Sequence, residues 1–192
     1  YNIDLLNADR LVVARNVFLD GSSIARVDIP GGRIGGDLSF ERVDGDNVTL
    51  NWINGKIKNF EIVEGGAELI LAGAIVDGTI YLRGGSYADL NMVGIQIGGA
   101  IQFVNGTFSG EIDLTGARID RELHISSDKL GSPSWMANAS LLMRNTEVDT
   151  LQVLSSGWHL TEQLQKISVL EELPSGWDGT DTNYHQVPTD LT

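Results

Sequence analysis

Acidic side chains recur in the middle of the chain at intervals of about 21 residues. Glu68, Asp89 and Glu111 follow this spacing, and Asp113 stands two residues beyond Glu111. If folding brings these four positions onto one surface, their carboxylates form an acidic strip. Like charges side by side are destabilising unless water, a cation or a basic partner compensates them. The acidic strip is therefore a candidate binding site, with simple solvation as the alternative.

A second series with nearly the same spacing consists of Glu61, Tyr81, Gln102 and His124, here called the polar ladder. A carboxylate, a phenol and an imidazole in one column are groups that can carry out acid–base chemistry. No nucleophile motif accompanies them in the sequence. A hydrogen-bonded surface ladder is therefore the simpler interpretation, and acid–base catalysis is the alternative.

Other motifs give no catalytic or metal site. A glycine-rich run at 31–36 resembles a phosphate-binding loop, but a dinucleotide site needs a strand before that loop and a long helix after it. The histidines at 124, 159 and 185 are not spaced as zinc ligands. We predict no catalytic residue, no metal ligand and no cofactor, and the class of any small-molecule ligand is left open.

The element that must position these side chains is an apolar doublet, two aliphatic or aromatic residues separated by one residue. It returns about every eleven residues. The doublets are Val17/Leu19, Val27/Ile29, Leu38/Phe40, Val48/Leu50, Phe60/Ile62, Leu69/Leu71, Ile80/Leu82, Leu90/Met92, Ile101/Phe103, Ile112/Leu114, Leu123/Ile125, Leu141/Met143 and Leu151/Val153, with Ile3/Leu5 at the start. A fixed short period of this kind is typical of repeat proteins.

The doublets predict short β-strands, because alternate residues of a strand point to opposite faces and most residues between the doublet positions are polar. A helix would show an apolar period of 3.6 residues. Two doublets per turn give a coil of about 21–22 residues, and about seven such coils stack into an all-β, parallel β-solenoid. Parallel crossovers are almost always right-handed, so we predict a right-handed coil.

The period divides the chain into three parts. Residues 1–158 are predicted to form the solenoid, with an excursion loop at 126–140 where the doublet spacing lengthens. Residues 159–174 have a helical apolar pattern and are predicted to form a helix that caps the C-terminal end. Residues 175–192 are predicted to be an acidic tail.

Composition limits the kind of partner. The net charge of −13 argues against direct binding to nucleic acid or to anionic membranes, since both require a basic surface. The chain contains no cysteine, so it has neither disulfides nor thiolate ligands. No apolar run is long enough to span a bilayer and no secretion signal is visible, so we expect a cytoplasmic location.

Several segments resemble a family of bacterial repeat proteins. The run from Ile112 to Ile119 (IDLTGARI) and the run from Gly32 to Leu38 (GRIGGDL) are similar to repeated "GARIxGxLDL" units, and the segment 142–148 is similar to the one that closes those repeats. The resemblance covers roughly residues 5–158. It implies a solenoid related to those of pentapeptide-repeat proteins and says little about function. Members are sometimes labelled membrane-associated oxidoreductases, but this sequence shows neither a membrane span nor a nucleotide-binding signature.

Three functional interpretations follow from the sequence. The first is a non-enzymatic structural or protein-interaction module, which binds a protein partner or a second copy of itself. The second is an acidic mimic of DNA that inhibits a DNA-handling enzyme. The third is a carbohydrate-binding or carbohydrate-active β-helix, for which the acidic strip is the only candidate site. The absence of a dense catalytic constellation favours the first.

Overall fold

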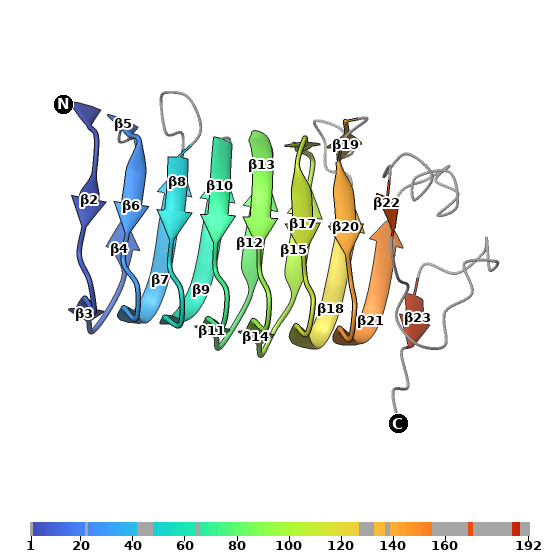
Figure 1. The fold of residues 1–192 in the computed structure, drawn as a ribbon. Helices are drawn as coiled ribbons and strands as arrows, with labels where there is room; N and C mark the ends of the chain where they lie inside the picture. The colour runs from blue at the N-terminus through green and yellow to red at the C-terminus, as the bar shows by residue number, and fades with distance from the viewer. Residues whose placement is uncertain are drawn as a thin grey trace.

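The computed structural model describes residues 2–21, 23–41, 48–63, 66–126, 133–136, 139–154, 169–170 and 186–188. Every regular element within these residues is a β-strand, and there is no helix among them (Figure 1). The prediction of an all-β chain is therefore confirmed.

The strands form two main sheets and one small one. The first main sheet stacks β2 (Leu6–Asn7), β6 (Arg26–Asp28), β8 (Val48–Asn51), β10 (Gly66–Ile70), β13 (Ser86–Asn91), β17 (Glu111–Asp113), β20 (Ser140–Leu142) and β22 (Val169–Leu170), with β16 (Thr107–Phe108) beside β13 and β19 (Ser134–Trp135) beside β16. The second contains β3 (Val12–Val13), β4 (Val17–Phe18), β7 (Arg33–Glu41), β9 (Lys56–Val63), β11 (Ile75–Val76), β12 (Ile80–Arg83), β14 (Gln96–Ile97), β15 (Ile101–Val104), β18 (Arg118–Ser126), β21 (Glu147–Leu154) and β23 (Gln186–Pro188). The small sheet pairs β1 (Asn2–Ile3) with β5 (Ser23–Ile24).

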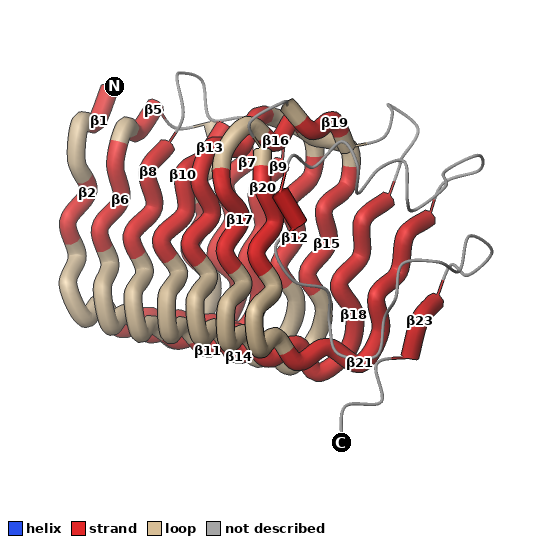
Figure 2. Tube along the Cα trace, turned by 45° about the vertical axis from the view of Figure 1, so that its right-hand side comes forward, coloured by secondary structure: helices blue, strands red, loops and turns tan. Residues whose placement is uncertain are grey.

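The chain coils around a single axis. It runs down through the near sheet and up through the far sheet while it advances from the N-terminal to the C-terminal end, which is a right-handed coil (Figure 1). The turned view shows the same coils lying one beside the next along the rod (Figure 2). Among the described strands all pairs are parallel except β21 with β23. These features confirm a right-handed parallel β-solenoid, and the count of about seven coils stays a prediction.

The strand register confirms the coil length in the regular part of the chain. Leu69 pairs with Leu90 and Leu90 with Ile112 in the first main sheet. On the other side of the coil Ile80 pairs with Ile101, and Ile101 with Leu123. Partners are thus 21 or 22 residues apart, as the doublet period predicts.

The core is the interior of the coil. The doublet residues Leu69, Leu90, Ile80 and Ile101 are all 0% exposed, because β alternation points both residues of each doublet inward. The corner between β15 and β17 is filled by aromatic packing, in which Tyr87 stacks on Phe108 with ring centroids 5.1 Å apart. Rows of buried side chains therefore run along the axis from one coil to the next.

One corner of the coil is a turn that recurs in the same place. Leu71 accepts a hydrogen bond from the backbone N–H of Ala74, and Met92 accepts the corresponding bond from Ile95. The third residue of each turn has a positive φ, 65° at Gly73 and 63° at Gly94. A positive φ at this position defines a type II turn and favours glycine. The repeated turn fixes where each strand of the first main sheet ends.

The predicted phase of one doublet is wrong. The structure pairs Leu50 with Val27 and with Leu69, and both Leu50 and Trp52 are buried, so the doublet of this coil is Leu50/Trp52, two residues later than predicted. One turn of the coil takes 23 residues from Val27 to Leu50 and 19 residues from Leu50 to Leu69. A fixed period cannot follow such a change in step, because extra residues at a corner move the whole strand along the chain.

The doublet predicted at Ile3/Leu5 is also wrong. Leu6 pairs with Val27, so Leu6 and Ala8 occupy the inward positions of this strand. Ile3 and Leu5 are 43% and 49% exposed.

The predicted C-terminal elements fall mostly outside the described residues. Within the predicted capping helix at 159–174, only Val169 and Leu170 are described, and they form strand β22 beside β20 and not a helix. Within the predicted tail at 175–192, Gln186–Pro188 forms β23, antiparallel to β21. Within the predicted excursion loop at 126–140, Ser134–Trp135 forms β19, which extends the stack beyond β16.

Candidate functional site

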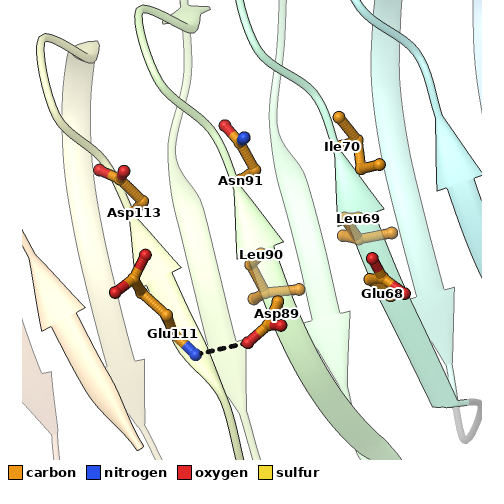
Figure 3. A pocket seen from close by; sticks show the side chains of 8 residues that line it. All are labelled: Glu68, Leu69, Ile70, Asp89, Leu90, Asn91, Glu111 and Asp113. Carbon is orange, nitrogen blue, oxygen red and sulfur yellow. Dashed lines mark hydrogen bonds between the residues drawn. The ribbon is translucent and has the colours of Figure 1, made fainter.

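The acidic strip lies on the outer face of the first main sheet. Glu68 on β10, Asp89 on β13 and Glu111 on β17 stand on three successive strands, and Asp113 follows Glu111 on β17 (Figure 3). Adjacent strands are about 4.8 Å apart, which sets the spacing of the first three carboxylate-bearing residues along the axis. The structure thus brings together all four residues that the sequence assigns to the acidic strip.

The strip borders a shallow hollow of about 420 Å³. Besides the four acids the hollow is lined by Leu69, Ile70, Leu90 and Asn91. Leu69 and Leu90 are fully buried and point into the core, so the apolar side chain that faces the hollow is Ile70. The hollow therefore combines a carboxylate rim with an apolar contact.

Two of the four carboxylates are part of the local structure. Asp89 Oδ1 accepts a hydrogen bond from the backbone N–H of Glu111 at 2.8 Å, as Figure 3 shows. Asp113 Oδ1 accepts one from the backbone N–H of Thr115 at 2.9 Å. Side chains of this type often satisfy the backbone at corners and turns. Asp89 and Asp113 therefore have a structural reason to be acidic or amidic whether or not the strip binds a partner.

The two glutamates are held more loosely. Glu68 accepts a long hydrogen bond of 3.4 Å from the Thr49 hydroxyl, and the Glu111 side chain is exposed. No basic side chain among the described residues forms an ion pair with either carboxylate. Glu68 and Glu111 are therefore the acids of the strip that are most available to a partner.

A cation closes the N-terminal end of the strip. Arg26 pairs with Thr49 in the strand register, and Thr49 pairs with Glu68, so Arg26 lies two strands before Glu68. Arg26 donates a 2.9 Å hydrogen bond to Asp28. This hydrogen bond, the charge of Asp28 and the charge of Glu68 all raise the pKa of the Arg26 guanidinium. The uncompensated negative charge of this face therefore begins at Glu68.

The polar ladder lies on the second main sheet. Glu61 pairs with Tyr81, Tyr81 with Gln102, and Gln102 with His124, so the predicted column is confirmed as a set of register neighbours. His124 Nδ1 lies 3.5 Å from Glu122 Oε1 on the same strand. His124 Nε2 is buried and without a hydrogen-bond partner among the described residues.

The spacing of the ladder limits its chemistry. Glu61 and His124 are three strands apart, which corresponds to about 14 Å at the usual strand spacing. General acid–base catalysis requires each group to be within hydrogen-bond reach of the atom it protonates or deprotonates. The carboxylate and the imidazole therefore cannot act together on one small group, and the ladder is better suited to a surface contact.

The columns beside the acidic strip differ from the sequence prediction at one coil. A strict 21-residue period counted along the sequence puts Asn47 midway between Arg26 and Glu68, and puts Thr49 in line with Asp28. In the structure Thr49 pairs with Arg26 and Glu68. The change follows from the shifted phase of the Leu50 strand.

Sequence analysis missed a second hollow, of about 400 Å³, at the N-terminal end of the second main sheet. Its lining includes the cations Arg15 and Lys58, the aromatic Phe18 and the glycines Gly35 and Gly36. Arg15, Gly36 and Lys58 are 21 and 22 residues apart, so the coil period was the signal that could have placed them in one line.

Within the residues that the structure describes, no group of three or more His, Cys, Asp or Glu side chains is placed to hold a metal ion. No described helix has the length and hydropathy needed to cross a membrane.

The fold and the strip together define a β-solenoid repeat protein with an acidic face. Comparisons with protein-family models, with curated proteins and with solved structures give no match. The resemblance to "GARIxGxLDL" repeat proteins stays a prediction.

Proposed function

We propose that the chain is a non-enzymatic protein-interaction module, in which a rigid β-solenoid presents the acidic strip to a basic segment of a partner protein. The observation that supports this proposal is that the four acids of the strip are held in two different ways. Asp89 and Asp113 accept backbone hydrogen bonds, whereas Glu68 and Glu111 stand at the rim of the hollow without an ion pair among the described residues.

The solenoid supports such a role because it fixes the acids before a partner arrives. Glu68, Asp89 and Glu111 belong to strands that are paired on both sides, so their backbone positions are set by the register. A preorganised surface loses less conformational entropy on binding than a mobile one. Carboxylates at regular intervals then favour a basic segment, and they raise the rate of encounter with it.

The polar ladder supports the non-enzymatic part of the proposal. Its titratable groups are spread along the sheet, and Glu61 and His124 are too far apart to share one reacting atom. A column of mixed polar and aromatic side chains suits a contact surface.

The test uses an oligolysine peptide as the basic probe and measures its affinity by isothermal titration calorimetry. The variant Glu68→Gln/Glu111→Gln removes the two loosely held carboxylates. Rim charges are worth up to about 1 kcal/mol each, so we expect a loss of affinity of roughly fivefold to thirtyfold.

A matched control separates the strip from net charge. The variant Asp4→Asn/Asp9→Asn removes two exposed acids of the first coil and changes the net charge by the same amount. We expect it to bind oligolysine nearly as well as the unmodified protein. Equal losses in the two variants would show that the probe reads overall charge, and the proposed function would then be wrong.

A further inference from the structure

The cationic hollow that sequence analysis missed is the feature of the molecule that the proposed function leaves unexplained. Arg15 and Lys58 are both exposed, and neither forms an ion pair with a described residue. Phe18, which lines the same hollow, is 62% exposed, although most of the aromatic side chains whose burial the structure describes are buried. An exposed aromatic residue beside two unpaired cations is an arrangement common at contact surfaces.

The hollow exists because one coil lacks side chains at this corner. Gly36 lies between Arg15 of the preceding coil and Lys58 of the following coil, and its backbone N–H donates to the Arg15 carbonyl. A Cβ at Gly35 would lie 2.5 Å from the Ala14 carbonyl oxygen, so a larger residue does not fit without a shift. The floor of the hollow is therefore formed by backbone atoms, and the side chains of Arg15 and Lys58 lie on either side of it.

The two hollows match each other in charge and in spacing. Arg15 and Lys58 are separated by two coil steps, and Glu68 and Glu111 are also separated by two coil steps. Two steps correspond to about 10 Å in each case. Two rods that lie side by side with their axes aligned can therefore bring both cations opposite both carboxylates.

We infer that the partner of the acidic strip is a second copy of this chain, which offers its cationic hollow at Arg15 and Lys58. This inference rests on the proposed function, because it names the partner of the same strip. The two surfaces belong to different sheets of the solenoid. Each copy can therefore bind one neighbour through its acidic strip and another through its cationic hollow. Such a heterologous contact leaves a free surface of each kind on the complex and allows chains of more than two copies.

Phe18 is the apolar part of this contact. It lies on the strand that follows Arg15, and the apolar side chain facing the acidic hollow is Ile70. Removal of exposed aromatic surface from water favours association without regard to charge. This apolar contribution to association is needed because copies with a net charge of −13 repel one another at long range.

The experiment is a charge swap, followed by sedimentation velocity over a range of protein concentrations. The variant Arg15→Glu/Lys58→Glu carries glutamates in its hollow and keeps the acidic strip. The variant Glu68→Lys/Glu111→Lys carries lysines in place of the two loosely held glutamates of the strip and keeps the cationic hollow. We expect the unmodified protein to self-associate and each variant alone to sediment as a monomer. An equimolar mixture of the two variants should form complexes again, because the introduced glutamates of one variant then meet the introduced lysines of the other.

Two results would overturn the inference. One is a mixture that stays monomeric while the unmodified protein associates, and the other is self-association of either variant alone at the concentrations where the unmodified protein associates. Melting curves of each variant establish that it is folded, and all four positions lie on the outer surface of the coil.

Oligolysine binding distinguishes a failure of this inference from a failure of the proposed function. The variant Arg15→Glu/Lys58→Glu keeps its acidic strip and should bind oligolysine at least as tightly as the unmodified protein. If oligolysine binding depends on Glu68 and Glu111 but no self-association occurs, only the identity of the partner is wrong. If oligolysine binding does not depend on these residues, the proposed function itself is wrong.

Discussion

The two main sheets of the solenoid are alike on the inside and different on the outside. Leu90 on β13 and Leu82 on β12 are both 0% exposed and occupy equivalent rows of the core. On the outer surfaces the first sheet carries a hollow rimmed by carboxylates, and the second carries the polar ladder. Stacking therefore specifies the inward residues and leaves the outward residues free to differ between the two sheets.

The largest expected effect tests whether the two interiors are equivalent. Leu90→Ala and Leu82→Ala each remove a fully buried side chain and leave a cavity, so each should lower the free energy of unfolding by about 2–5 kcal/mol. We expect the two losses to agree within about 1 kcal/mol, because both side chains pack in the same kind of row. Urea denaturation followed by circular dichroism measures them, and a loss confined to one sheet would contradict the comparison.

A smaller effect concerns the glycine before β17. A Cβ at Gly110 would lie within 2.8 Å of the Ala88 backbone and still closer to Asp89 Oδ1. Gly110→Ala should therefore cost about 2–3 kcal/mol of stability through overpacking.

Gly116 is the control for this prediction. It has φ of 65°, and a Cβ added there would meet no atom within 4 Å, so Gly116→Ala tests the cost of a positive φ without a collision, about 1 kcal/mol. Equal melting temperatures of the two alanine variants would mean that close approach of the coils is not what requires glycine at 110.

Much of the interior could be predicted from the sequence, because the doublet period fixes which residues point inward. Leu90 and Ile112 were placed correctly by spacing alone, and the register of the polar ladder followed from the same spacing. The strand at Leu50 was misplaced, because a corner of unusual length is invisible to a fixed period. Strands β19, β22 and β23 were missed, since segments of two or three residues carry too little pattern.

The candidate site was predicted in position but not in detail. The period brought Glu68, Asp89 and Glu111 together, yet it could not show that Asp89 serves the backbone of the next coil. That role depends on the direction of a side chain at a corner. The cationic hollow was missed for a similar reason, because a hollow arises where Gly35 and Gly36 lack side chains between two longer residues.

Tyr87 gives a prediction that depends on pH. Its hydroxyl is buried and has no hydrogen-bond partner among the described residues, and burial raises the pKa of the phenol above its ordinary value of 10.0. The folded state therefore favours the protonated phenol. This contribution to stability is fully present below pH 10 and is lost as the pH rises above 10, where the unfolded chain releases the proton.

The variant Tyr87→Phe isolates this contribution. It keeps the stacking on Phe108 and removes an unpaired buried hydroxyl, so at pH 7 it should be more stable by about 1 kcal/mol. Above pH 10 the advantage of the variant should grow. Thermal melts at several alkaline pH values measure the difference, and parallel stability curves for the two proteins would contradict the assignment.

The smallest expected effect separates the two kinds of acid within the strip. Asp89→Ala removes the acceptor of the Glu111 backbone N–H and should cost about 1 kcal/mol. Glu111→Gln changes an exposed carboxylate and should alter stability by less than about 0.5 kcal/mol. Chemical denaturation of both variants tests this order. A larger loss for Glu111→Gln would show that Glu111, and not Asp89, is held by the local structure.

Successive coils place residues about 21 apart directly beside one another, and cysteine cross-linking can measure this register because the chain has no cysteine of its own. Tyr81 and Gln102 are register neighbours on β12 and β15, and the usual strand spacing of about 4.8 Å suits a disulfide. The variant Tyr81→Cys/Gln102→Cys should therefore form an intramolecular disulfide in mild oxidant. The control Tyr81→Cys/His124→Cys, two strands apart at about 10 Å, should not. A disulfide in the control, or none in either variant, would contradict the stacked register on which every proposed surface depends.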